Sequence, residues 1–194
     1  MKRLNVFVLP LLVLILAGCG ASKPLVQRPY DPQQDARIRI FGSNGLGISY
    51  YENQVCIPKA GGVQAIGGWG QSFQSLLGVA ESKSIGIPET GRAPTEALAA
   101  KEYFNEYVIQ AERPLVLSMA FSKAPTVSFF TEYRCGTFNL GFTPEAGKDY
   151  EAFLRFDNGR KRCEAHIREI VSDGATKAVS LFKAPSCPRR EEES

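Results

Sequence analysis

Residues 149–174 read DYEAFLRFDNGRKRCEAHIREIVSDG, and this stretch decides the fold. Polar and apolar side chains alternate over residues 149–156 and again over 162–171, which is the period of a half-buried β-strand. Between the two runs stands Asp157-Asn158-Gly159, a strong hairpin signal. Asp173-Gly174 then turns the chain into a further run at 176–182. The sequence here predicts antiparallel strands joined by tight turns.

The same period of two continues through most of the chain. Further strands are predicted at residues 37–40, 48–51, 107–109, 115–121 and within 126–142. We expect residues 126–182 to form an antiparallel meander, and Gly42-Ser43-Asn44-Gly45 to form a hairpin turn rather than a phosphate-binding loop, because the P-loop lysine is missing. The prediction is a mainly β fold of seven or eight strands, a sandwich or small barrel, in one domain over residues 35–187.

A glycine-rich insertion at residues 61–104 interrupts the strands. Apolar residues fall at intervals of three and four over residues 66–81, which predicts an amphipathic helix. A second short helix is expected from Pro94 to Phe104. Trp69 and Phe73 allow two interpretations: buried, they cover the open end of a sandwich; exposed, they contact a glycan or a partner protein. We predict that residues 61–91, centred on Trp69 and Phe73, form an interaction surface.

The first nineteen residues have the order of a secretory signal. Lys2 and Arg3 precede an apolar run at residues 4–16, which is too short for a transmembrane helix, and Leu16-Ala17-Gly18-Cys19 follows. This arrangement resembles the signal and lipobox of bacterial lipoproteins. The resemblance implies that residues 1–18 are removed and that Cys19 carries the lipid that anchors the protein to a membrane. The alternative is an uncleaved N-terminal anchor.

The residues after Cys19 indicate the membrane and the attachment. Gly20 stands where an aspartate would favour retention at the inner membrane, so the resemblance implies a periplasm-facing position on the outer membrane. Residues 19–34 are rich in proline and glutamine and are expected to form a tether. The charged residues 188–194 are expected to be a disordered tail.

Charge and motifs exclude several classes of function. Lys2 and Arg3 leave with the signal, so 21 of the 23 basic residues remain against 20 acidic residues. That balance is unlike a nucleic-acid-binding protein, which concentrates basic charge. The chain has no motif for a cofactor, so none is expected.

Five cysteines agree with an oxidising compartment. Setting Cys19 aside leaves four, which predicts two disulfides. Extending the hairpin at Asp173-Gly174 places Cys163 near Cys187, which pairs these two and leaves Cys56 with Cys135. Zinc ligation is the competing interpretation, but no cysteine pair has the short spacing of a zinc site.

Catalytic residues are not evident. His166, the one histidine, is expected on a solvated strand face with Glu164 and Arg168, and no G-x-S-x-G motif accompanies it. Carboxylates at 145, 149, 151 and 157, and a helical pair at 102 and 106, are expected to be surface charge. We therefore assign no catalytic or metal-binding residue.

Two short sequence segments, residues 36–40 and 145–151, are similar to segments in uncharacterised proteobacterial lipoproteins with β-sandwich-type domains. The resemblance implies the fold and transfers no activity. Three functions follow as hypotheses: a non-enzymatic envelope module that binds, inhibits or stabilises another protein; a lipoprotein that binds carbohydrate or peptidoglycan through Trp69; and a hydrolase with an unrecognised carboxylate site. No small-molecule ligand can be named.

Overall fold

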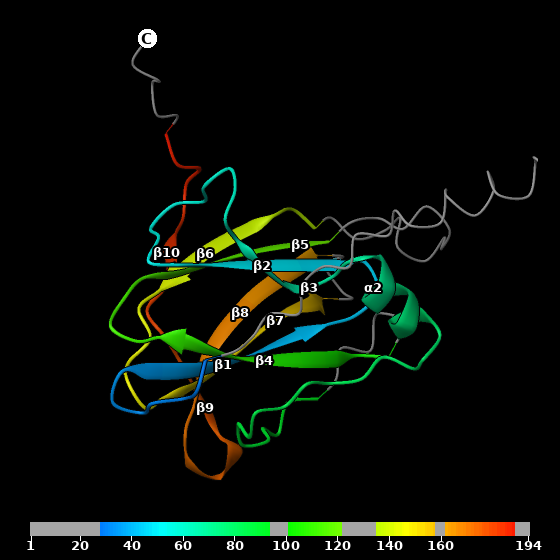
Figure 1. The fold of residues 1–194 in the computed structure, drawn as a ribbon. Helices are drawn as coiled ribbons and strands as arrows, with labels where there is room; N and C mark the ends of the chain where they lie inside the picture. Colours follow the sequence, from blue (N-terminus) through cyan, green and yellow to red (C-terminus); the bar gives the residue numbers. More distant parts are fainter. Residues whose placement is uncertain (1–27, 94–100, 122–134, 158–161, 189–194) are drawn as a thin grey trace, which may run out of the picture.

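A computed structural model describes residues 28–93, 101–121, 135–157 and 162–188 as a β-sandwich of two five-stranded sheets (Figure 1). The first sheet has the strand order β4-β1-β7-β8-β9, and the second has the order β10-β6-β5-β2-β3. The strands are β1 (Asp35–Gly42), β2 (Leu46–Glu52), β3 (Val63–Ile66), β4 (Tyr103–Gln110), β5 (Leu115–Phe121), β6 (Phe138–Phe142), β7 (Asp149–Asp157), β8 (Arg162–Ile170), β9 (Thr176–Ala178) and β10 (Phe182–Lys183). The predicted mainly β sandwich is confirmed, and the two sheets do not close into a barrel.

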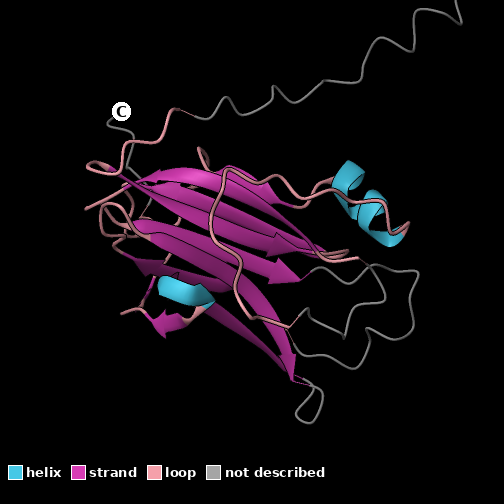
Figure 2. Ribbon diagram, turned by 90° about the horizontal axis from the view of Figure 1, so that it is seen from below, coloured by secondary structure: helices cyan, strands magenta, loops and turns pink. Residues whose placement is uncertain are grey.

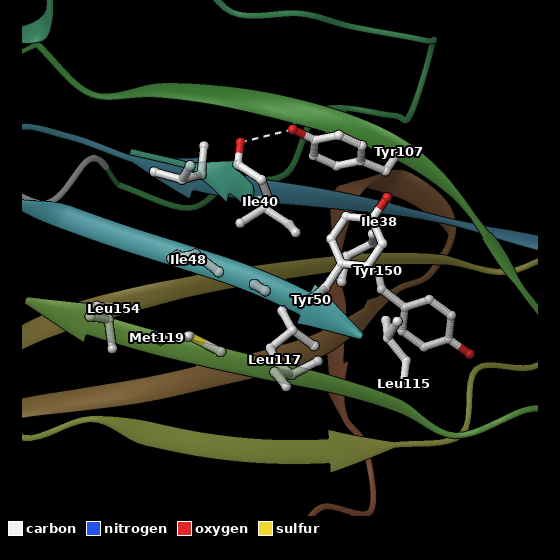
Figure 3. Packing of buried hydrophobic residues seen from close by; sticks show 14 of the residues in the cluster. Ile38, Ile40, Ile48, Tyr50, Tyr107, Leu115, Leu117, Met119, Tyr150 and Leu154 are labelled. Carbon is white, nitrogen blue, oxygen red and sulfur yellow. Dashed lines mark hydrogen bonds between the residues drawn. The ribbon is translucent and has the colours of Figure 1, made fainter. Parts of the chain in front are cut away.

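The core lies between the sheets, where alternate residues of each central strand point inward. Ile38 and Ile40 of β1 face Ile48 of β2 and Leu117 of β5, and all four are fully buried (Figure 3). Tyr107 of β4 donates a hydrogen bond from its hydroxyl to the carbonyl of Ala65 in β3, at 2.8 Å. The alternation visible in the sequence is therefore the alternation between core and outer face.

The strands pair differently from the predicted meander. Only β7, β8 and β9 form one, with Asp157 opposite Arg162 and the expected turn at Asp173-Gly174; residues 158–161 lie outside the described residues. β6 lies in the second sheet, beside β5 and β10, while β7 pairs in parallel with β1, with Arg37 opposite Asp149. The meander prediction is wrong at β6 because the chain changes sheets between β6 and β7.

The turn after β1 is also a change of sheet. β1 and β2 belong to different sheets, so residues 42–45 do not form the predicted hairpin. At Gly42 an added Cβ would lie 2.2 Å from the Ile66 side chain, so glycine permits the close approach of β1 to β3. Periodicity identifies strands but does not tell whether a short connection keeps the chain in its sheet.

The predicted helices are shorter or displaced. The first, α2, covers Trp69–Leu76, because Ile66 belongs to β3 and the positive φ angles of Gly67 (103°) and Gly68 (96°) interrupt the backbone before the helix. The second prediction fails at its end, since Tyr103 and Phe104 begin β4. Residues 94–100 lie outside the described residues, as do residues 1–27 and 189–194, which hold the predicted signal, Cys19, most of the tether and nearly all of the predicted tail.

The last residues of the predicted tether lie against the domain. Arg28 forms an ion pair with Asp35 at 2.6 Å, and the guanidinium of Arg37 stands 4.7 Å from the ring centre of Tyr30. The chain therefore enters the sandwich at the start of β1, while α2 lies at the end where β1 finishes (Figure 1). Eight residues of extended strand separate these ends by about 25 Å.

Candidate functional site

The helix α2 turns its polar side toward the domain. Ser75 is 0% exposed; its hydroxyl donates to the carbonyl of Lys101 at 2.7 Å, and the Lys101 amide donates to the Ser75 carbonyl at 3.1 Å. Gln71 and Ser72 are half-buried. A surface helix ordinarily buries its apolar stripe, so α2 is inverted relative to that pattern.

The apolar side of α2 faces solvent. We call the exposed set the apolar patch; it consists of Phe73 (61% exposed), Leu76 (45%), Leu77 (59%) and Val79 (59%). Phe73, Leu76 and Leu77 are neighbours on one face of the helix, because they are spaced by three and four residues. The Val79 amide donates to the Gln74 carbonyl at 2.9 Å, which folds this residue back beside the helix.

The predicted surface around Trp69 and Phe73 is thus partly described. Phe73 lies in the apolar patch, and Trp69 begins α2, although its side chain is not among those the structure describes. The sequence pattern identified Leu76 and Leu77 as positions on the apolar face of the helix but left open whether that face is buried or exposed. A further signal was available: residues 61–80 contain no charged residue, in a chain where 22% of residues are charged.

A strap, defined as Ser82–Arg92, crosses the outer face of the first sheet. The Lys83 amide donates to the Phe104 carbonyl at 2.9 Å, which attaches the strap to the outer edge of β4. Farther along, Thr90 donates to the Glu151 carboxylate of β7 at 2.8 Å. Beneath the strap, Arg39 and Glu106 form an ion pair at 2.6 Å with both side chains buried.

The ion pair is fully hydrogen-bonded. Arg39 donates to the carbonyls of Ile87 at 2.6 Å and Pro88 at 3.0 Å, while the second carboxylate oxygen of Glu106 accepts from the Ile85 amide at 2.6 Å. Burial alone would raise the pKa of Glu106, but the Ile85 amide, Arg39 and further donors outweigh it, and the pKa is lowered. The group is a structural anion.

Of the carboxylates considered from the sequence, Glu145 is exposed as expected, whereas those at 102, 106, 149 and 151 are half-buried or buried and have partners. Glu151 is buried and bonded to Thr90, and Asp149 accepts two bonds from Arg37, each 2.8 Å long. Glu102 pairs with Arg92, and Glu106 belongs to β4 rather than to a helix. The side chain of Asp157 is outside those described. Among the described residues, these carboxylates have structural partners, while one carboxylate oxygen of Glu151 is buried without a hydrogen bond.

His166 lies on the outer face of β8 with Glu164 and Arg168, as expected, but its side chain is only 22% exposed. Its ring stacks on Phe153 with centroids 5.0 Å apart, and its Nε2 atom is 3.5 Å from the Glu164 carboxylate. Burial first, and Arg168 second, lower the pKa of His166, so the ring is neutral at neutral pH. Within the described residues no group of His, Cys, Asp or Glu side chains could hold a metal ion.

The two predicted disulfides are present, but their pairing was wrong. Cys56 bonds to Cys187 and Cys135 bonds to Cys163. The chain leaves the first sheet after Ala178, so the hairpin does not extend as far as Cys187. Instead the Cys187 amide donates to the Ile57 carbonyl at 2.9 Å, which places Cys187 beside Cys56.

A cavity of about 390 Å³ opens near the chain's crossing from β9 to β10. Phe142 and Tyr150 line it together with Glu169 and Lys177. Glu169 is buried and pairs with Lys177 at 3.0 Å and with Lys148 at 3.5 Å. Burial, the first cause, raises the pKa of Tyr150 to about 12. The two lysines compensate the charge of Glu169, and Glu145 also lines the cavity.

Comparison with protein-family models and with curated proteins finds no match. Among the described residues, no helix combines the length and apolar character needed to cross a bilayer.

Proposed function

We propose that this protein is a lipid-anchored module of the bacterial cell envelope that binds another protein and carries no enzymatic activity of its own. The lipobox supports the anchor at Cys19 and, with Gly20, a periplasm-facing place on the outer membrane. One observation carries the binding function: α2 buries Ser75 and exposes Phe73, Leu76 and Leu77. Contiguous exposed apolar side chains on a globular domain mark interaction sites.

The position of the apolar patch fits this function. The tether enters at Asp35 and the patch lies at the opposite end of β1, so a protein held by Cys19 would present the patch away from its own anchor (Figure 1). A partner in the envelope would meet that end first.

Carbohydrate binding is the second candidate, because Phe73 is an exposed ring beside the position of Trp69. Sugar recognition combines a stacking ring with hydrogen-bonding groups that fix orientation. The neighbours of Phe73 in the patch are aliphatic, which favours a protein surface. A pull-down on purified peptidoglycan with the Trp69→Ala variant distinguishes the two: binding that is strong in the wild type and lost in the variant supports the carbohydrate function.

The test of the proposed function is capture in intact cells. Cells that produce the full chain are treated with a short crosslinker, and proteins joined to it are identified by mass spectrometry. We expect the double variant Phe73→Ser/Leu77→Gln to lose its specific partner. Val55→Ser is the matched control, since Val55 is 60% exposed but is not part of the patch. Equal capture by the wild type and the double variant contradicts the proposal.

A further inference from the structure

We infer that α2 inserts as a preformed helix into a concave, apolar groove of the partner protein. This inference rests on the proposed function and specifies the shape and chemistry of the partner. In helix-in-groove recognition, anchors recur at spacings of three and four along one face of a helix. Phe73, Leu76 and Leu77 have these spacings and are exposed.

The helix is a projecting element. Seen from below, α2 stands beyond the end of the strands rather than lying on a sheet (Figure 2). The exposed side chains of Phe73, Leu76 and Leu77 form a narrow apolar ridge on this projecting helix, which we call the crest. Only a concave partner surface contacts the crest and both of its flanks. Ser72 and Gln74 mark those flanks, because they lie on opposite sides of the crest, about 100° around the helix from Phe73.

Size argues against a second copy of this chain as the occupant. Four exposed side chains form a patch on the order of a few hundred Å², whereas a specific interface buries about 800 Å² on each partner. Two crests meeting each other bury little beyond the patch itself. A groove buries the crest and both flanks together, which increases the contact area without additional apolar residues.

Charge argues against a bilayer as the occupant. Helices that lie in a membrane interface carry lysine or arginine on their polar face, and no charged residue occurs between residues 61 and 80. The polar face of α2 is turned to the domain through Ser75 instead. The central part of a protein interface is depleted of charge, so an uncharged crest matches an uncharged groove.

The helix is held in its bound form before a partner arrives. An isolated helix of eight residues is marginal in water. Here the Ser75–Lys101 bonds fix its last turn, the amides of Val79 and Ala80 both donate to the Gln74 carbonyl, and Ala80 is buried in the core. Such preorganisation lowers the ordering cost of binding.

The test places a photo-reactive phenylalanine analogue, p-benzoylphenylalanine, at single positions of the full-length protein in the cells that produce it. The positions are Ser72, Phe73, Gln74, Leu76 and Leu77, with Val55 as the control. Irradiation should give one adduct mass from all five positions and at least tenfold less from Val55. Peptide mapping should place the adducts of Ser72 and Gln74 on two different segments of one partner, the two walls of the groove.

Four outcomes overturn the inference: the first two leave the proposed function standing, and the last two refute it as well. Adducts from Phe73, Leu76 and Leu77 with silent flanks indicate a flat partner surface, and a product at twice the chain mass indicates a second copy; in both cases a protein still binds. Adducts to lipid alone, or no adduct at any position of a correctly disulfide-bonded protein, refute the proposed function as well.

Discussion

Arg39 and Glu106 show how one pair of residues holds a segment that has no secondary structure. The strap pairs its backbone with β4 only at Lys83, and amides and carbonyls of residues 85–88 bond to these two buried side chains instead. The pair also joins β1 to β4 on the outer face of the first sheet. The sequence does not predict this role, because alternation assigns Arg39 only to the non-core face of its strand and Glu106 was expected to be surface charge on a helix.

Replacing Arg39 should therefore lower the stability of the folded protein. Arg39→Met leaves the Glu106 carboxylate buried without its counter-charge, and we expect the free energy of unfolding to fall by about 3–5 kcal/mol. Urea unfolding followed by tryptophan fluorescence or circular dichroism measures the change. Arg113→Met, at an exposed position of the β4–β5 turn, serves as the matched control and should change stability by less than about 0.5 kcal/mol. Similar losses in the two variants would contradict the role of the ion pair.

Lowering the pH should reveal the contribution of the Glu106 carboxylate to the free energy of unfolding. The pKa of Glu106 is lower in the folded than in the unfolded protein, so its contribution to stability is complete above about pH 4.3 and is lost as pH falls below that value. We expect Glu106→Gln to be less stable than wild type at pH 7, and the gap to narrow between pH 5 and pH 2.5. Urea titrations across this range provide the measurement; a gap that is constant with pH is the contrary result.

At the scale of elements, strands were predictable and their partners were not. Alternating residues located most of the strands, and the turns at Asp157 and Asp173-Gly174 correctly joined β7 to β8 and β8 to β9. β3 was missed, because a four-residue strand is too short for its period to be visible. Sheet membership depends on contacts between distant residues, such as Arg37 with Asp149, and local periodicity carries no information about them.

The candidate site was predictable in place but not in orientation. Glycine content, the lack of charge and the helical period all pointed to residues around Phe73. The period alone favours burial of the apolar face. Only the bonds between Ser75 and Lys101, residues 26 positions apart, determine which face turns inward.

Substitutions on the two faces of α2 should change stability by different amounts, which tests this orientation. Ser75→Ala removes a buried hydrogen bond and should lower the free energy of unfolding by about 1–2 kcal/mol. Phe73→Ser alters an exposed side chain and should change it by less than about 0.5 kcal/mol. Chemical denaturation of both variants decides the matter. A larger loss for Phe73→Ser would mean that the apolar face is the buried one.

The disulfides offer a prediction about connectivity and cost. Peptide mapping without reduction should find Cys56 with Cys187 and Cys135 with Cys163. The first bridge spans 131 residues and the second spans 28. The first bridge therefore restricts the unfolded chain more than the second. Replacing both cysteines of the first bridge by alanine should cost about 1 kcal/mol more than the same change in the second. An equal or reversed order in denaturant melts would show that native-state contacts dominate instead.

For the whole molecule, the anchor is the feature to test. Cys19→Ala should prevent lipid attachment, and the protein should then accumulate as an unprocessed precursor or as a product that washes from membranes. Fractionation and gel mobility after labelling with a radioactive fatty acid measure this. The control variant Cys56→Ala/Cys187→Ala keeps Cys19 and should still take up label. Unchanged processing and fractionation of the Cys19→Ala variant would contradict the part of the proposed function that places a lipid anchor at Cys19.

The central place of β1 has a consequence for the order in which the chain can fold. β1 needs Val108 of β4 on one edge and Asp149 of β7 on the other, both opposite Arg37. A ribosome delivers these partners long after β1 itself, and a pattern dominated by such distant pairings folds slowly. The emerging chain therefore cannot complete the first sheet around β1 until β7 has been made. Export across a membrane, which the proposed function requires, needs an unfolded chain, and β1 lacks its β7 partner until the last quarter of the chain has been made.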